Sequence, residues 1–192
     1  MNIFILDQNP RQAARYHCDK HVVKMILEHT QMLSTAIRVC SKDSVDGIYK
    51  VAHLNHPCSK WVRENRGNFL WLCEMTEELF NEYTKRYNKQ HKSWDTFVKC
   101  RNNANILPIG TLTKFAQAMP EEYKNKDPIT AYRTYYIKDK KELTVVDSGT
   151  WSKAATSSQV LLAGVGVFAM AWLAAPRGAL GANASAFSML AA

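Results

Sequence analysis

The sequence lacks the patterns that would mark a disulfide framework, a metalloprotease or a secreted precursor. Its five cysteines form no CxxC pair and are odd in number, so we expect reduced thiols and an intracellular protein. The metalloprotease motif HExxH is missing, and the sequence opens without the basic leader of a signal peptide. No internal repeat is visible. These absences favour an ordinary intracellular domain.

Length and charge give the first positive indications. A chain of 192 residues with 46% hydrophobic content is long enough for one domain with a full core. The formal net charge is +8, from 25 basic and 17 acidic residues. Such an excess favours a polyanionic partner, either nucleic acid or an anionic membrane surface.

The composition changes abruptly near Trp151. Residues 154–176 carry no charge, and residues 178–192 are rich in alanine and glycine. We therefore predict two parts, a basic helical catalytic or DNA-binding domain over residues 1–150 and an uncharged hydrophobic tail over residues 151–192. Because about 20 apolar residues span a bilayer, the tail could contact a membrane through residues 154–176. A buried terminal helix and a disordered appendage are the alternatives.

Long helices dominate the expected fold. The spacing of apolar residues predicts helices over residues 10–39 and 59–88, the first of them capped by Asn9. A third helix should begin at Asp127-Pro128 and end near residue 141. Proline and glycine interrupt the stretch between residues 90 and 128. We expect a mainly α protein, a compact single-domain helical bundle of about three main helices with irregular connections.

One face of the first predicted helix carries polar side chains at spacings of four, three, four and three residues. They are His17, His21, Lys24, Glu28 and Gln31. At about 100° per residue they fall within an arc of roughly 80°. A solvated face usually repeats lysine and glutamate, whereas paired histidines favour a functional site.

These residue types are suited to proton transfer and to attack by a nitrogen nucleophile. We assign candidate catalytic roles to Glu28 and Lys24 in covalent chemistry, and to His17 and His21 in proton transfer near neutral pH. The competing interpretation is an ordinary ion pair between Lys24 and Glu28 on the helix surface.

A second polar group, HLNHPCS, precedes the second predicted helix. Together with the first helix it supplies enough imidazole for an alternative metal site formed by His17, His21, His53 and His56. The spacing matches no closed zinc-finger pattern, and the leading interpretation requires neither a metal nor another cofactor.

Basic and aromatic residues surround the second and third predicted helices, and they could hold phosphates and stack on bases. The candidate nucleic-acid-binding residues are Asn55, His56, Lys60, Arg63, Arg66, Arg86, Lys89, Lys92 and Arg133. Trp94, Tyr132 and Tyr135 are the candidate stacking residues.

Several segments resemble a group of small proteins encoded mainly by bacteriophages, which is distantly similar to the pyrimidine-dimer DNA glycosylase/lyase family. The resemblance covers about residues 1–140. The segments that carry it are MNIFILDQNP, AARYHCDKHVVKMILEHTQML, HLNHPCSKW, LFNEYTKRYNKQHK, AMPEEYK and AYRTYY.

The resemblance implies a compact all-helical enzyme that flips a nucleotide out of damaged duplex DNA and attacks C1′ of its sugar with an amine. A Schiff base then forms, and a glutamate on the first helix, here Glu28, promotes sugar opening and β-elimination. The family's nucleophile is the α-amine freed by removal of the initiator methionine, which needs a small second residue. Here that residue is Asn2, so Met1, Lys24 and Lys20 are the alternatives. Lys24 is preferred because it shares a face with Glu28.

We therefore expect a cytoplasmic protein of the host cell that acts on DNA. The leading function is a DNA-repair or DNA-modification glycosylase with AP-lyase chemistry on damaged or modified pyrimidines in duplex DNA. The alternatives are a metal-dependent hydrolase or nuclease that uses the histidines, and a non-catalytic helical adaptor that binds nucleic acid. Membrane association would depend on the tail.

Overall fold

Helices supply the regular secondary structure of residues 1–139, the part of the chain that the computed structural model describes. The mainly α prediction is confirmed. The α-helices are α1 (Pro10–Arg15), α2 (Asp19–Cys40), α3 (Pro57–Glu64), α4 (Arg66–Tyr87), α5 (Trp94–Asn102) and α6 (Pro128–Asp139). Two short 3-10 helices, η1 (Ala104–Ile106) and η2 (Glu121–Tyr123), lie in the connections.

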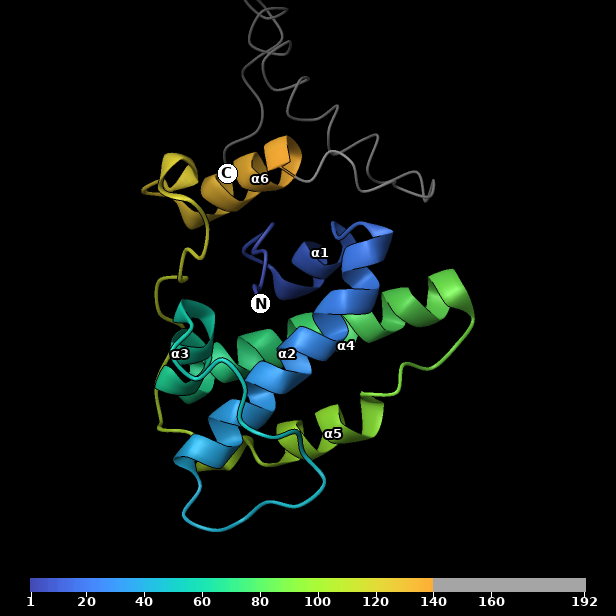
Figure 1. The fold of residues 1–192 in the computed structure, drawn as a ribbon, viewed down its shortest axis with the longest axis vertical. Coiled ribbons are helices and arrows are strands. Elements are labelled where there is room, and N and C mark those ends of the chain that lie inside the picture. Colours follow the sequence, from blue (N-terminus) through green and yellow to red (C-terminus); the bar gives the residue numbers. More distant parts are fainter. Residues whose placement is uncertain (140–192) are drawn as a thin grey trace, which may run out of the picture. The chain divides into compact units, whose positions relative to one another are not determined.

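The two longest helices, α2 and α4, contain 22 residues each and pack against one another at the centre of the core. Helix α1 packs on α4, while α3 and α5 pack against α2, as Figure 1 shows. Apolar side chains of both central helices, among them Ile26, Leu33 and Leu72, are fully buried. This arrangement leaves one side of α2 facing the start of the chain.

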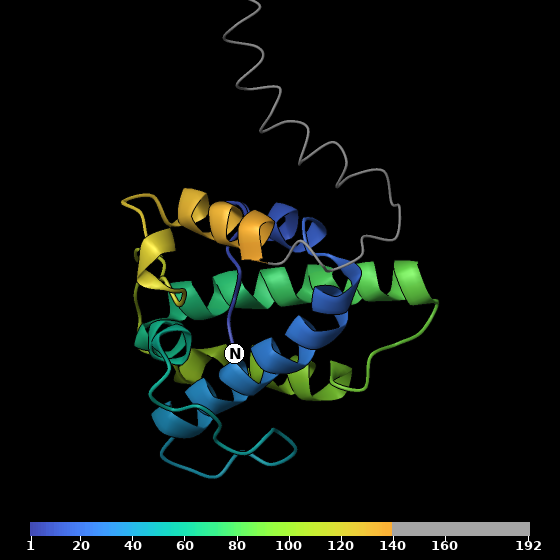
Figure 2. The same cartoon turned by 45° about the horizontal axis from the view of Figure 1, so that its top comes forward.

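The amino-terminal segment is part of the core. Residues 2–6 are buried and have no regular secondary structure, and Figure 2 shows the amino terminus reaching the middle of α2. Phe4 stacks on the ring of His21, with ring centroids 4.6 Å apart, and also contacts Tyr136 of α6. The segment is therefore held between α2 and α6.

The structure corrects the first two predicted helices, because each is broken in two. The predicted helix over residues 10–39 stops at Arg15, and Cys18 adopts an extended conformation before α2. The predicted helix over residues 59–88 begins at Pro57 and is interrupted at Asn65, whose φ and ψ are −160° and 168°. Apolar side chains keep nearly the same helical spacing across both breaks, so periodicity did not reveal them.

Of the remaining predictions, the start of the third helix is confirmed, but one further helix was not predicted. The less regular stretch contains an unpredicted helix, α5, whereas α6 begins at the predicted Pro128 with Asp127 accepting hydrogen bonds from the Ile129 and Thr130 amides. No helix within residues 1–139 is long and apolar enough to cross a membrane. The predicted domain boundary at residue 150 and the proposed membrane contact lie outside the described residues.

Candidate active site

A carboxylate on α2 lies between two amines. Glu28 occupies the middle of α2, and its side chain is only 13% exposed. Its Oε2 atom lies 3.7 Å from the amino group of Met1 and accepts a hydrogen bond of 3.1 Å from the Asn2 amide. Its Oε1 atom lies 3.6 Å from Nζ of Lys24, one helical turn away. The site thus joins two nitrogen nucleophiles to one acid-base group.

The side chain of Asn2 anchors the segment that brings the Met1 amine to Glu28. Its Nδ2 donates to the Ala118 carbonyl at 2.7 Å, and its Oδ1 accepts from the Ile3 amide at 2.8 Å. The hydroxyl of Tyr132 holds the same stretch of chain, since it donates to the Ala116 carbonyl and accepts from the Ala118 amide. Helix α6 therefore helps to fix the amino terminus.

Met1 is held by its side chain and exposed through its main chain. The side chain is 1% exposed, and its thioether accepts a hydrogen bond from Oγ of Ser59 in α3. The residue as a whole is half-buried, so its exposed surface belongs to main-chain atoms. The Met1 amine is thereby positioned by buried groups while the main chain of the residue stays partly exposed.

His56 interacts electrostatically with the Met1 amine and with Glu28. Its Nδ1 accepts a hydrogen bond from the Cys58 amide at 3.2 Å and caps α3, so the proton of the neutral ring resides on Nε2. Burial lowers the pKa of His56, and the positive charges of the Met1 amine and of His53 lower it further, against a smaller opposing effect of Glu28. A neutral ring with one N–H donor therefore stands near the amine and the carboxylate.

The loop that carries His56 has a fixed conformation. His53 adopts a positive φ of 48°, which is uncommon for a residue with a side chain, and its carbonyl accepts the His56 amide at 3.0 Å. The guanidinium of Arg63 donates to the Leu54 carbonyl at 2.6 Å. Strained backbone of this kind is often found at functional sites.

The predicted polar face of residues 17–31 is only partly formed. Lys24 and Glu28 come together, but His17 precedes α2 and is fully buried, with Nδ1 donating to the Ala13 carbonyl at 2.8 Å. Burial lowers the pKa of His17 to about 3. His21 is also buried, with its Nδ1 2.7 Å from the Tyr136 hydroxyl. Both histidines pack around the amino-terminal segment.

The alternative metal site is not assembled. His17 and His21 lie in the core, whereas His53 is exposed on its loop. Within residues 1–139 no group of three or more histidine, cysteine, aspartate or glutamate side chains is placed to hold a metal ion.

Sequence reasoning missed three residues that support the site. Asn2 was considered only as an obstacle to methionine removal, and Ser59 was not singled out. His29, one residue after Glu28, is fully buried with Nδ1 3.3 Å from Oγ1 of Thr76, and burial lowers its pKa to about 3. The position of His29 on the apolar side of α2 is the sequence feature that could have predicted its burial. Contacts such as Asn2 with Ala118, 116 residues apart, leave no local pattern.

The predicted DNA-binding arginines are engaged in the fold. Arg86 is mostly buried, with ion pairs to Glu82 and Asp19 and a hydrogen bond to the His17 carbonyl. Arg63, Arg66 and Arg133 each donate to a main-chain carbonyl. The exposed members of the predicted set include Asn55, Lys60, Lys89 and Lys92.

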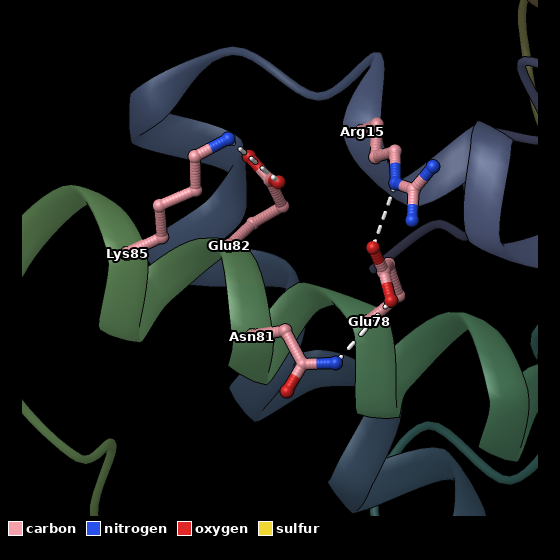
Figure 3. A pocket seen from close by; sticks show the side chains of 5 residues that line it. All are labelled: Arg15, Glu78, Asn81, Glu82 and Lys85. Carbon is pink, nitrogen blue, oxygen red and sulfur yellow. Dashed lines mark hydrogen bonds and ion pairs between the residues drawn. The ribbon is translucent and has the colours of Figure 1, made fainter.

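A hollow of about 360 Å³ lies along α4 beside α1. Figure 3 shows that its charged groups face one another. Arg15 pairs with Glu78 at 2.7 Å, and Lys85 lies 3.9 Å from Glu82. The pair between Arg15 and Glu78 joins α1 to α4, whereas Lys85 and Glu82 both lie on α4.

The described residues form an all-helical protein in which the amino group of Met1 lies beside the Glu28 carboxylate. The family model described as pyrimidine dimer DNA glycosylase matches residues 1–96, and the chain belongs to this family. The matched segment includes Met1, Glu28 and His56. No curated protein and no solved structure matches the chain. Family membership makes the chain a glycosylase-like protein of DNA repair, with DNA as its substrate class.

Proposed function

We propose that this protein is a DNA glycosylase with AP-lyase activity on damaged or modified pyrimidines in duplex DNA. The observation that carries the proposal is the placement of the Glu28 carboxylate between the amino group of Met1, at 3.7 Å, and Nζ of Lys24, at 3.6 Å. An amine beside a carboxylate is the minimum equipment for forming and resolving an imine with a sugar.

Met1 is the better nucleophile of the two. Its side chain is buried, which fixes the amine, whereas the Lys24 side chain is 66% exposed and free to turn toward solvent. The geometry thus favours Met1 over Lys24, the nucleophile expected from the sequence.

The reaction proceeds through an imine between Met1 and the sugar. The amine nitrogen bonds to C1′ as the bond between C1′ and the base breaks, and the base leaves with the electron pair and takes up a proton. Glu28 accepts the proton lost by the amine and delivers it to the ring oxygen O4′. The bond from C1′ to O4′ then opens and leaves the imine.

Strand cleavage follows from the same two residues. Glu28, again ionised, removes a proton from C2′, and the resulting electron pair expels the 3′-phosphate. Water hydrolyses the imine, which releases the sugar aldehyde and restores the amine. His56, held neutral, can donate a hydrogen bond from its Nε2–H group to the leaving base or to a phosphate oxygen, while the proton that the base takes up comes from solvent. The nucleotide must leave the base stack to reach the site, which costs least at a damaged base.

Borohydride trapping with the full chain tests this function. Wild-type protein incubated with ultraviolet-irradiated or abasic duplex should form a covalent complex, and peptide mass analysis should place the adduct on the amino-terminal residue. Lys24→Arg, which keeps the charge without a usable nucleophile, should still be trapped. Glu28→Gln should reduce strand cleavage by about 10² to 10⁴-fold. Glu74→Gln, on the exposed side of α4, is the matched control.

Other outcomes assign the protein differently. An adduct on Lys24 would keep the lyase and overturn the assignment of Met1. Cleavage that chelators abolish, without any trapped complex, would indicate a metal-dependent nuclease. Salt-dependent binding without product would indicate a non-catalytic adaptor.

A further inference from the structure

One face of α2 is covered over its carboxyl-terminal half and open over the rest. The Ala52 amide and carbonyl pair with the Thr35 hydroxyl, and Arg38 donates to the carbonyls of Ile48 and Tyr49. The segment formed by residues 48–52 therefore lies along α2 near residues 35–38. Toward the helix amino terminus, the face that includes Leu27 is exposed.

Exposed apolar side chains lie near the candidate-site residues in the sequence. Leu27, which directly precedes Glu28, is 40% exposed, and Val23 lies one turn before it with 38% exposure. Leu54 is 39% exposed and stands two residues before His56, in the loop that Arg63 holds. Each leucine is carried by the same rigid element as a residue of the site.

Basic side chains accompany these leucines. Lys20 and Lys24 are exposed on α2 near Val23 and Leu27, and Lys60 is exposed on α3, which follows the loop of Leu54. An apolar surface set among cations suits a partner that presents phosphates around an apolar interior, as duplex DNA does. An apolar protein surface would offer no anionic partner to Lys20 and Lys60, whereas Lys24 is already paired with Glu28.

We propose that Leu27 and Leu54 form an apolar wedge that enters the base stack of duplex DNA at the lesion and holds it open. The inference rests on the proposed function, because the wedge delivers the damaged nucleotide to Met1 and Glu28. Leucine is among the side chains that proteins insert between base steps. The neighbouring lysines bind the flanking phosphates and set the depth of insertion.

Single-turnover cleavage of duplex and single-stranded substrates tests the wedge. The full-length variants Leu27→Ala and Leu54→Ala are compared on an abasic duplex and on the same abasic strand alone. Opening is needed only in the duplex, so each variant should be slowed about tenfold on duplex and less than about twofold on the single strand. Leu70→Ala on α4 removes a leucine of equal exposure, 39%, and should affect neither substrate.

A binding assay separates the wedge from the chemistry. With 2-aminopurine opposite the abasic site, wild-type protein should raise the fluorescence as the base unstacks, and the two variants should raise it less at saturating protein. Equal slowing on both substrates, or wild-type behaviour on duplex, would overturn the wedge. If wild-type protein cleaves neither substrate, the proposed function fails, while the fluorescence change still decides whether Leu27 and Leu54 unstack DNA.

Discussion

At the scale of the residue, Asn2 connects the site to the rest of the protein. Its main-chain amide donates to Glu28, while its side chain joins the Ile3 amide to the Ala118 carbonyl. A small second residue could not make the side-chain contacts. Asn2 therefore stabilises the amino-terminal segment that carries the Met1 amine.

Replacing Asn2 tests this positioning role. Asn2→Leu keeps the approximate size and a large second residue but leaves two buried main-chain groups without partners, which should lower the free energy of unfolding by about 1–3 kcal/mol. Because the Met1 amine loses its anchor, the single-turnover rate on abasic duplex should fall while binding of the duplex is retained. Urea denaturation and rapid-quench kinetics measure the two effects.

The exposed Asn102 provides the control, since Asn102→Leu at the end of α5 should change neither quantity. A destabilised Asn2→Leu protein with the wild-type rate would restrict Asn2 to a structural role.

Only part of the site was predictable from the sequence. Lys24 and Glu28 follow from helical spacing, because residues four apart on one helix lie together whatever the rest of the fold does. The Met1 amine reaches Glu28 through packing of residues 2–6 in the core, and nothing near Met1 in the sequence encodes that path. His17 was misplaced because its spacing agrees with a helix that ends before it.

At the scale of the element, the break at Asn65 decides how α3 and α4 meet. The Asn65 side chain accepts the Asn68 amide at 3.0 Å and caps α4. The amides of Arg66 and Gly67 donate to the Pro108 and Gly110 carbonyls, at 2.7 and 3.0 Å. The buried Val62 and Phe69 are seven residues apart, a spacing that agrees with one continuous helix, so these distant carbonyls distinguish two helices from one.

Gly67 is required where the connection crosses α4. A Cβ atom at this position would lie 2.5 Å from the Thr111 carbonyl carbon and 2.6 Å from the Leu112 nitrogen, and main-chain atoms cannot move aside cheaply. Gly67→Ala should therefore destabilise the protein by about 1–3 kcal/mol even though alanine favours helix. Thermal unfolding measures the loss, with Glu74→Ala on the same helix as control. A melting temperature equal to that of wild type would show that the connection adjusts freely.

At the scale of the described fold, two neutral histidines are buried around the amino-terminal segment. His17 and His29 are fully buried, and burial lowers the pKa of each from 6.5 to about 3. The mainly α fold was predictable from apolar spacing, and the position of His29 on the apolar side of α2 indicated its burial. The burial of His17 was not predictable, because a histidine at that spacing suits a surface face equally well. The burial of both histidines makes stability depend on pH.

The sign of this dependence follows from proton binding. Between pH 6.5 and about 3 the unfolded chain binds a proton at each of these histidines, whereas the folded protein does not. Their contribution to stability is therefore complete above pH 6.5 and is lost as the pH falls toward 3. Each histidine should lower the free energy of unfolding by up to about 1.4 kcal/mol per pH unit within that window.

Urea unfolding between about pH 5 and 7.5 measures the slope, and His29→Leu isolates one of the two protons. The slope of the free energy of unfolding against pH should be smaller for the variant than for wild type, because leucine has nothing to titrate. The difference should correspond to close to one proton. Asn102→Leu, at an exposed position without a titratable side chain, should keep the wild-type slope. If His29→Leu also kept that slope, His29 would have to remain accessible to protons in the folded state, and the packing of α2 against the amino-terminal segment would be looser than its contacts with Ile3 and Thr76 require.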